Sequence, residues 1–506
     1  MTRSRCLAAL ASLCLTVSAP TLAHAQATIG GDWREDITAF ARRIVEAGLT
    51  PGMAVAVSQG DWVLYTRGFG FADVAAGRPV DEGTAFYIAS TSKALTATAV
   101  VLEAAKGKID LDTPIDRYIR GLRFRAPMDA HRVTVKQFLT MTDGLEESGP
   151  VVTRTAYTGD FTYPLLIELL ADYGPAERGT AFDYDNLPYN ILGIALDPKS
   201  DDGWKEVVRR DVLEPLGMTS TSARVSAMDP ARIAMPHELV PGLVWRRLPL
   251  GKRDANMHAA GGHFASAGDL ARFVAAHASG GLVEGRRVFP EAAIASTHEQ
   301  HADQDRAFGP YQRFGWGYGW DLATWRGRTI IQRFGGFAGY RSHASFEPTS
   351  RVGVVVLVNG DGPASPASDL LATYIYDRLL GRDSIAAVYD RQLADHKARV
   401  VEGEQRVAST LAQRAARLAP LSHPLEAFAG TYENPKFGTM TWRVVAGGLE
   451  VRMGVATSRA EVYDAAKDQL RVELFDGGTV AGFEFPAGGG PATAVTLIGE
   501  RFARRN

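Results

Sequence analysis

The composition is that of a globular protein with a large core. The chain has 506 residues, of which 46% are hydrophobic and 22% are charged, and its formal net charge is −2. This balance excludes an intrinsically disordered chain and a polytopic membrane protein. No block of Lys or Arg stands out, so nucleic acid is not an expected partner. The length suits about three folding units, or one large mixed domain with a smaller one.

Residues 1–25 have the pattern of a secretory signal peptide. Met1–Arg5 contains two arginines, Leu7–Ala19 is an apolar run too short to span a bilayer, and Ala23–Ala25 is a small-x-small cleavage site. Both cysteines lie in this segment, so the mature chain cannot use a thiolate nucleophile or a cysteine-ligated metal. No second apolar stretch of membrane-spanning length follows. We therefore expect cleavage after Ala25 and a periplasmic or secreted protein.

Beyond this segment, the first half of the chain predicts a helix, a hairpin and then a largely helical region. Trp33–Ala47 has the apolar spacing of an amphipathic helix, and Met53–Ser58 and Trp62–Arg67 are two strands separated by a short turn. Ser90–Lys106 has no Gly or Pro and is rich in Ala, Leu and Val, which predicts a buried helix ending at the next glycine. The stretch 133–280 is mostly helical with long loops.

Strands return in the later part of the chain. The pattern predicts strands at Arg328–Gln332, His343–Phe346 and Arg351–Val358, and a helix at Ala367–Leu380. Strands at both ends with helices between them indicate one α+β domain over residues 26–384. We expect its sheet to close with late strands beside early ones.

Two further segments follow this domain. Residues 385–424 are charged, Ala-rich and helix-prone until two prolines end the pattern, which indicates a helical connector. Residues 425–506 alternate between apolar and polar residues, with glycine pairs such as Gly447-Gly448 between the alternating runs. This pattern predicts a small antiparallel β domain, with strands at Thr439–Val445, Leu449–Met453, Gln469–Leu474 and Ala494–Ile498.

The first candidates for chemistry are Ser90 and Lys93, at the start of the predicted helix. Residues three apart share a helix face, so the hydroxyl and the amine can meet in one pocket. A lysine in apolar surroundings can lose its proton near neutral pH and act as the base for a serine nucleophile, while free N–H groups at the helix start can stabilise an oxyanion. This spacing is common by chance, but the apolar stretch Phe86–Ala89 before it strengthens the hypothesis.

Tyr184 and Asn186 are the second candidates. They lie in a loop before a short apolar helix, and alternation puts both side chains on one side of an extended segment. A phenol near a lysine can relay protons, and an amide can hold both the lysine and a substrate carbonyl. Without the serine and the lysine, a tyrosine packed in a wall would be the better interpretation of Tyr184.

Other motifs carry less weight. His298 and His301 have the wrong spacing for a two-histidine zinc site on a helix, and there is no nucleotide loop or Gly-x-Ser-x-Gly elbow, so neither a metal nor a cofactor is expected. The aromatic run Phe314–Trp320 alternates as one strand. It is either sheet core, which we favour, or the wall of an apolar acyl pocket.

Taken in order, these motifs resemble the serine β-lactamase and penicillin-binding-protein family, in particular its class C-like esterases and D-amino-acid peptidases. The resemblance covers residues 35–380 and rests on Ser90-x-x-Lys93, Tyr184-x-Asn186 and a Gly-rich stretch near residue 335. It implies the β-lactamase/transpeptidase-like fold, an antiparallel sheet flanked by helices with an all-helical subdomain. The C-terminal domain resembles a lipocalin-like barrel. Three flanking stretches also fit the family: Gly107–Pro114, Val212–Thr219 and Ala260–Phe273.

The resemblance implies a role for each motif residue. Ser90 would be acylated, and Lys93 and Tyr184 would share the general acid–base work. Asn186 would orient the lysine and the substrate. The oxyanion would lie between the N–H groups of Ser90 and Gly336. Because this scheme needs no histidine, three histidines near the expected cleft are interpreted as structural: His237, His258 and His263.

The third family motif, Lys-Thr-Gly or His-x-Gly, is altered in this sequence. The aligned residues are Arg333, Phe334 and Gly335, which we expect to contact the substrate. Arginine stays protonated, so Arg333 can anchor an anionic substrate group or favour a nearby phenolate, but it cannot shuttle a proton. Phe334 cannot donate a hydrogen bond to a substrate carboxylate, which weakens the case for efficient β-lactam or D-Ala-D-Ala cleavage. Gly335 permits close approach of the backbone, with a strand bulge as an equal alternative.

We therefore predict an exported serine hydrolase that forms an acyl-enzyme on Ser90. Its substrate would be a small-molecule ester, or a small amide or peptide containing a D-amino acid, with weak β-lactamase activity at most. No cofactor, nucleic acid or membrane span is expected, and the oligomeric state is left open. The alternative is a catalytically degenerate family member that binds peptidoglycan fragments or a protein partner, in which case Arg333 would mark lost chemistry.

Overall fold

The computed structural model describes residues 32–505, apart from 147–148, 243, 250, 362–365, 383, 418–419 and 476. The predicted signal peptide, residues 1–25, lies outside the described residues. Helix α1 (Trp33–Glu46) begins at Asp32, whose carboxylate accepts hydrogen bonds from the backbone N–H groups of the first turn. Within the described part of the chain, no helix combines the length and the apolar character needed to cross a bilayer.

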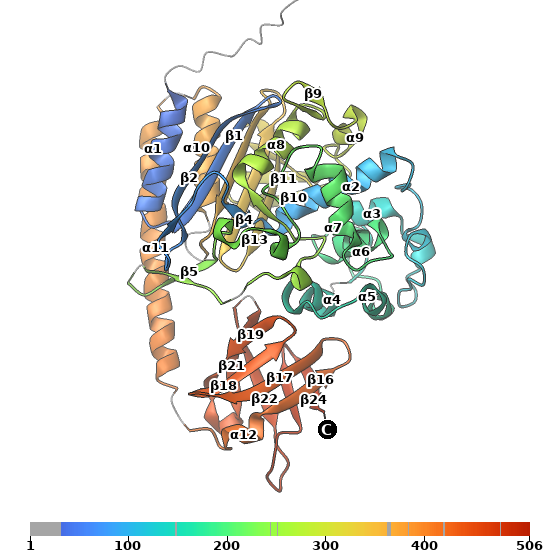
Figure 1. Ribbon diagram of the computed structural model, residues 1–506, viewed down its shortest axis with the longest axis vertical. Helices are drawn as coiled ribbons and strands as arrows, with labels where there is room; N and C mark the ends of the chain where they lie inside the picture. The colour runs from blue at the N-terminus through green and yellow to red at the C-terminus, as the bar shows by residue number, and fades with distance from the viewer. Residues whose placement is uncertain are drawn as a thin grey trace, which may run out of the picture.

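A nine-stranded antiparallel sheet forms the centre of the N-terminal domain (Figure 1). Its strands lie in the order β10-β11-β12-β13-β14-β15-β1-β2-β3, and β15 pairs with β1 from Met53↔Val358 to Gln59↔Val352. This confirms the prediction that late strands close the sheet beside early ones. The bounds are β1 (Gly52–Gln59), β2 (Trp62–Asp73), β3 (Arg78–Pro79), β10 (Ala302–Phe308), β11 (Tyr311–Trp316), β12 (Asp321–Trp325), β13 (Arg328–Phe337), β14 (Tyr340–Glu347) and β15 (Val352–Val358).

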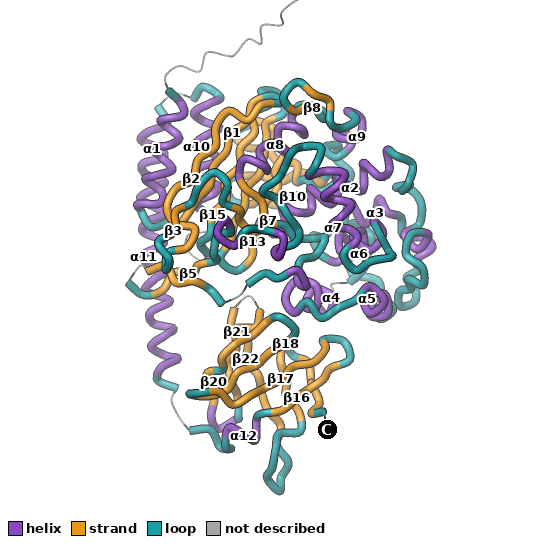
Figure 2. Tube along the Cα trace, in the orientation of Figure 1, coloured by secondary structure: helices purple, strands orange, loops and turns teal. Residues whose placement is uncertain are grey.

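Different helices cover the two faces of this sheet (Figure 2). Along β1, Val55 packs in the core beneath α1 and α10 (Ala367–Leu379), whereas its neighbour Ala54 packs in the core that includes α8 (Ala267–Ala278). Because both faces are covered, seven of the eight residues of β1 are buried in an unbroken run.

A helical region packs against one side of the sheet, with α2 at its centre. Helix α2 (Ser92–Ala105) contacts three other helices of this region, and its residues from Ser92 to Glu103 are all buried. The burial explains why most residues of this segment are apolar or small. The other helices are α3 (Val135–Thr140), α4 (Gly149–Val152), α5 (Tyr163–Leu170), α6 (Leu187–Leu196), α7 (Gly203–Val208) and α9 (Glu291–Ser296), and the short ribbons are β4 (Ala85–Tyr87) with β7 (Phe264–Ser266), β5 (His237–Val240) with β6 (Val244–Arg247), and β8 (Leu282–Val283) with β9 (Arg286–Arg287).

A long helix, α11 (Ile385–Ala415), connects this domain to the C-terminal domain (Figure 1). It lies within the predicted connector, 385–424. The C-terminal domain is a nearly closed, nine-stranded antiparallel sheet that resembles a barrel, with Trp442 and Phe483 among the residues of its own core. Its elements are α12 (Leu425–Phe428), β16 (Gly430–Asn434), β17 (Gly438–Val445), β18 (Gly448–Met453), β19 (Ala456–Arg459), β20 (Glu461–Asp464), β21 (Gln469–Phe475), β22 (Gly477–Glu484), β23 (Ala494–Leu497) and β24 (Glu500–Arg504).

The structure corrects one prediction about the sheet. The aromatic run Phe314–Trp320 is not a single strand, because β11 ends at Trp316 and β12 begins only at Asp321. The residues between them form a tight turn in which Gly319 has a positive φ of 82° and the N–H of Gly317 donates to the carbonyl of Trp320. Trp316 and Trp320 are fully buried, in agreement with the favoured interpretation as sheet core.

Candidate active site

Ser90 lies where the chain leaves β4 and begins α2. It is the middle residue of a short 3₁₀ turn, Ala89–Thr91, and α2 follows directly. Ala89 has a positive φ of 45°, a conformation that costs energy for a residue with a side chain. This turn places Ser90 at the N-terminal end of the helical segment, where backbone N–H groups have no partners within the helix.

Lys93 is completely buried, and its amine lies among polar groups from three segments. Its Nζ lies 3.5 Å from the Ser90 hydroxyl, donates to Oδ1 of Asn186 at 2.6 Å and donates to the carbonyl of Ala260 at 3.0 Å. Burial lowers the pKa of Lys93 below its ordinary value, and the nearby charge of Arg333 lowers it further. The arrangement thus favours loss of a proton from an amine that is beside a hydroxyl.

Tyr184 and Asn186 approach Lys93 from the loop that precedes α6, as the sequence predicted. The ring of Tyr184 lies 4.8 Å from the lysine Nζ, and Asn186 is the residue at which α6 begins. Partial burial raises the pKa of Tyr184, but the positive charges of Arg333 and Lys93 outweigh this effect and hold the pKa below its ordinary value. The phenol is therefore more easily ionised than that of a free tyrosine.

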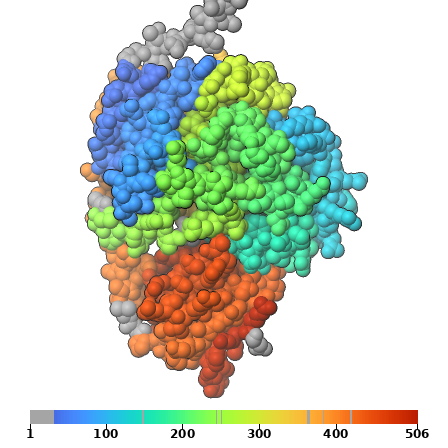
Figure 3. Space-filling model, in the orientation of Figure 1, coloured from blue at the N-terminus to red at the C-terminus, as the bar shows by residue number. Residues whose placement is uncertain are grey.

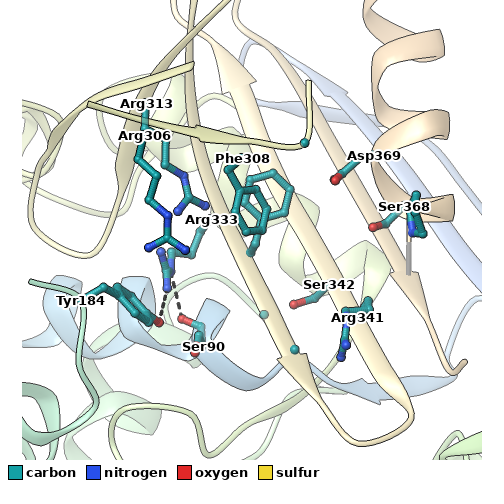
Figure 4. Close-up of a pocket in the computed structure, with 15 residues that line it drawn as sticks. Ser90, Tyr184, Arg306, Phe308, Arg313, Arg333, Arg341, Ser342, Ser368 and Asp369 are labelled. Atoms are coloured by element: carbon teal, nitrogen blue, oxygen red, sulfur yellow. Dashed lines mark hydrogen bonds between the residues drawn. The ribbon is translucent and has the colours of Figure 1, made fainter. Parts of the chain in front are cut away.

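The buried guanidinium of Arg333 connects this loop to the turn that carries Ser90 (Figure 4). Its Nε donates to the carbonyl of Ser90 at 3.1 Å, one Nη donates to Asp321 at 2.6 Å, and the other Nη donates to the hydroxyl of Tyr184. The guanidinium also lies 4.8 Å from the centre of the Tyr184 ring. Three segments of the chain are held by one side chain.

Sequence reasoning missed Asp321, the carboxylate partner of Arg333. Asp321 is 1% exposed and also forms an ion pair with Arg313 at 3.3 Å, so one carboxylate faces two guanidiniums. Its position as the first residue of β12, paired with Gln332 of β13, brings it beside Arg333. The only sequence signal was an acidic residue that ends an aromatic run, and the strand break that positions it was not predicted.

Strand β13 passes directly beside the turn Ala89–Thr91. Pairing of β12 with β13 ends at Gln332, so the next residues of β13 pair with β14 on one side only. Over one face of this strand, a Cβ on Gly335 would lie 1.9 Å from the carbonyl oxygen of Ile88, which explains the glycine at this position. The strand continues through Gly336, which is exposed to the cavity.

A cavity of about 460 Å³ opens in front of these groups (Figure 4). Ser90 and Tyr184 lie on one side of it, and Arg306 and Arg313, which face each other across β10 and β11, lie at one end. All three predicted substrate-contacting residues line this cavity, and Phe308 packs against the ring of Phe334 at 4.6 Å between centroids. Of its charged lining residues four are basic and one is acidic: Arg306, Arg313, Arg333, Arg341 and Asp369.

The histidines do not line this cavity. His263 packs its ring against Trp204, and burial lowers its pKa to about 3, so it is a neutral core residue. His258 accepts or donates one hydrogen bond with Asn190, and His237 bonds with the carbonyl of Asn359. None of the three lies among the described cavity residues.

A family model described as Beta-lactamase matches residues 38–376. The chain belongs to this family. The matched range includes every motif residue discussed above, from Ser90 to Gly336. It also contains all nine strands of the central sheet, whereas the first residues of α1 and the last residues of α10 lie outside it.

Two curated relatives are a penicillin-binding protein and an esterase. "Penicillin-binding protein 4" of Amycolatopsis lactamdurans is 28% identical over 63% of this chain and 84% of its own length. "Esterase EstB" of Burkholderia gladioli is 32% identical over 39% of this chain and 53% of its own length. Relatives of this kind are serine hydrolases, which supports a hydrolase role for the chain.

Solved structures confirm the fold class. The octameric penicillin-binding protein homologue from Pyrococcus abyssi covers 92% of this chain with a TM-score of 0.55 at 21% identity. EstCE1, described as a hydrolase with promiscuous acyltransferase activity, covers 69% of the chain with a TM-score of 0.57 at 19% identity. The predicted β-lactamase/transpeptidase-like α+β fold with a barrel-like C-terminal domain is thus confirmed.

The close approach of Gly335 generates a first prediction. In Gly335→Ala the new Cβ would overlap the Ile88 carbonyl, so β13 must move away from Ser90, and we expect kcat/KM for an activated ester to fall by about 10²-fold or more. Gly488→Ala is the control, because a Cβ there meets no atom within 4 Å. Equal activity in the two variants would contradict the tight contact.

The charge of Arg333 generates a second prediction, on pH dependence. Arg333 is the strongest of the charges that lower the pKa of Tyr184, so Arg333→Gln raises this pKa, and the acid limb of the kcat/KM profile moves to higher pH. Arg333→Lys keeps the charge and is expected to move the limb much less. Superimposable limbs for wild type and Arg333→Gln, measured by stopped-flow ester hydrolysis, would contradict this electrostatic coupling.

Proposed function

We propose that the protein is an exported serine hydrolase that acts through an acyl-enzyme on Ser90. The observation that carries the proposal is the position of the Lys93 amine, buried and 3.5 Å from the Ser90 hydroxyl, with Asn186 accepting its hydrogen bond at 2.6 Å. A buried amine with a lowered pKa is a competent base for a serine that otherwise is a weak nucleophile.

In the proposed reaction, Lys93 and Tyr184 together take the proton of Ser90 as its Oγ attacks the substrate carbonyl carbon. The bond to the leaving group then breaks, and the same pair returns the proton to the departing oxygen or nitrogen. Water repeats the sequence on the acyl-enzyme and releases the acid. Asn186 holds the lysine in line, and Arg333 holds the phenol, through the contacts described above.

Two backbone N–H groups would bind the oxyanion, those of Ser90 and Gly336. The β13–β14 hairpin has a two-residue loop, so its closing pair, Phe337 and Tyr340, is bridged by the turn hydrogen bond. Bonded and non-bonded pairs alternate along an antiparallel ladder, so Gly336 directs its N–H away from β14, toward the side where Ser90 lies. This alternation supports the predicted oxyanion role.

The proposed substrate is an ester, or a small amide or peptide that contains a D-amino acid. Phe334 packs on Phe308 at the place where the family motif carries a hydroxyl, so it supplies an apolar wall instead of a hydrogen-bond donor. This favours esters and small amides over β-lactams. The packed contacts among Ser90, Lys93 and Tyr184 also argue against the alternative of a degenerate binding protein.

A third prediction tests the nucleophile and separates these two functions. A fluorophosphonate probe should label the mature protein on Ser90, as mapped by intact-mass and peptide mass spectrometry. Lys93→Met should slow labelling by about 10²-fold to 10⁴-fold, because the base is lost while the volume is nearly kept. A folded wild-type protein that binds a peptidoglycan fragment but takes no label would instead establish the binding function.

A fourth prediction concerns the basic end of the cavity. The side chain of Arg306 has no hydrogen bond or ion pair within the part of the chain that the structure describes. It lies opposite Arg313, so an anionic substrate group would relieve the repulsion between the two guanidiniums. We expect a preference for a 4-nitrophenyl ester with a terminal carboxylate over its neutral isostere. In Arg306→Gln this preference should fall by about threefold to tenfold.

Arg328→Gln serves as the control, because Arg328 is an exposed arginine of the same sheet outside the cavity lining. It should leave the ratio of the two kcat/KM values unchanged. An equal ratio in wild type and in Arg306→Gln would show that this arginine does not select the substrate.

A further inference from the structure

The tip of the β13–β14 hairpin extends beyond the sheet, immediately after the proposed oxyanion donor. Phe337 follows Gly336, and beyond Gln332 strand β13 has a strand partner on one side only. Contacts at the tip therefore help to position this strand, together with the packing of Gly335 against Ile88 and of Gly339 against Pro236. The ring of Phe337 also packs against neighbouring side chains. Lys252 Nζ lies 3.8 Å from the ring centre, and the ring of Tyr87 lies 5.4 Å away between centroids.

Phe337 also contacts Tyr157, which in turn contacts the C-terminal domain. The ring of Tyr157 lies 5.6 Å from that of Phe337 between centroids. The ring of Tyr157 also contacts that of Phe475 in β21, at 5.4 Å between centroids and an interplanar angle of 87°. Edge-to-face geometry at this separation is a favourable aromatic contact. An uninterrupted row of rings therefore runs from the C-terminal domain to the residue beside the oxyanion donor.

The C-terminal domain is firmly docked at this point. Arg154, with a side chain 5% exposed, donates through Nε to the carbonyl of Lys436 at 2.6 Å and through Nη2 to that of Pro435 at 3.4 Å. The N–H of Val455 donates to the carbonyl of Thr158 at 2.8 Å. Figure 3 shows the two domains in continuous contact on this face of the molecule.

Both anchors flank Tyr157 in sequence. Arg154 and Thr158 belong with it to one helical turn, Thr153–Thr158. A Cβ on Gly454 would lie 2.0 Å from the carbonyl oxygen of Thr158, so the two backbones are already in contact there. The turn that carries Tyr157 is thus held by the C-terminal domain through Arg154, Tyr157 and Thr158.

We propose that the C-terminal domain is part of the active-site scaffold: Phe475 holds Tyr157, Tyr157 holds Phe337, and this row keeps the N–H of Gly336 where an oxyanion forms. Tyr157 and Phe475 are positioning residues, since neither lines the cavity. The inference rests on the proposed hydrolase function and extends it to a domain outside the matched family range.

The first test compares two phenylalanines of the same domain. Phe475 and Phe483 are 9% and 8% exposed and both belong to its core, but only Phe475 has an aromatic contact outside that domain. We expect Phe475→Leu to lower kcat for an activated ester about tenfold with little change in KM, because donor placement acts on the transition state. Phe483→Leu should lower the melting temperature comparably and leave kcat unchanged.

The second test uses the middle of the row. Tyr157→Leu removes the ring, and we expect the loss in kcat to be matched by an equal fold loss in affinity for a boronic acid that mimics the tetrahedral adduct. Tyr157→Phe keeps the ring and should therefore have the kcat and the boronic acid affinity of wild type. The double variant Tyr157→Leu, Phe475→Leu should lose no more kcat than Tyr157→Leu alone, because Phe475 acts on the donor only through Tyr157.

Several results would overturn the proposal. Equal kcat losses in Phe475→Leu and Phe483→Leu would show a general stability effect, and an unchanged kcat in Tyr157→Leu would show that the row does not reach the donor. Failure of the hydrolase function itself would look different, since wild type would then hydrolyse no ester and bind no boronic acid. In that case hydrogen–deuterium exchange still decides the structural part: exchange in a peptide covering 333–341 must accelerate in Tyr157→Leu and not in Phe483→Leu.

Discussion

The guanidinium of Arg333 joins two neighbouring strands of the sheet to two segments that are far away in the sequence, those of Ser90 and Tyr184. From β13 it reaches the backbone of Ser90, the phenol of Tyr184 before α6 and the carboxylate of Asp321 on β12. A planar group with five donors and a permanent charge can hold three acceptors in fixed directions at once. A lysine at this position would carry the same charge on a single atom and could not reach all three in one plane. This side chain therefore helps to hold the turn that carries Ser90 against the sheet.

The same charge sets the acid–base properties of the cavity. Burial makes a charged Lys93 costly, and Arg333 beside it adds repulsion, so the amine is driven toward its neutral form. The same charge lowers the pKa of the Tyr184 phenol, because a phenolate is attracted by Arg333 and, while the amine is protonated, by Lys93. An arginine in the altered motif is therefore consistent with retained chemistry: it activates its neighbours by electrostatics and not by carrying a proton itself.

The sequence predicted the parts of the fold that have strong local patterns. The unbroken apolar run of β1 and the Gly-free, Pro-free segment beginning at Ser90 were assigned correctly, because one has the composition of a buried strand and the other that of a buried helix. Strands β10 and β12 were not predicted, and β11 was predicted only in part, as the first half of the aromatic run Phe314–Trp320. Their residues 302–325 mix charges, glycines and aromatics. Most of β10 is exposed and polar, so its sequence does not alternate between apolar and polar residues. Asp321, Arg306 and Arg313 were missed with them.

The sequence by itself determined which groups are proposed to react. The spacing of Ser90 and Lys93 is a property of one helical turn, and the spacing of Tyr184 and Asn186 is a property of one extended loop, so both could be read locally. Only the tertiary structure decided how these groups are activated and held. The charge of Arg333 on Tyr184, the carboxylate of Asp321 and the ring row through Tyr157 all depend on contacts between distant segments, and such contacts follow from how the sheet and the two domains pack.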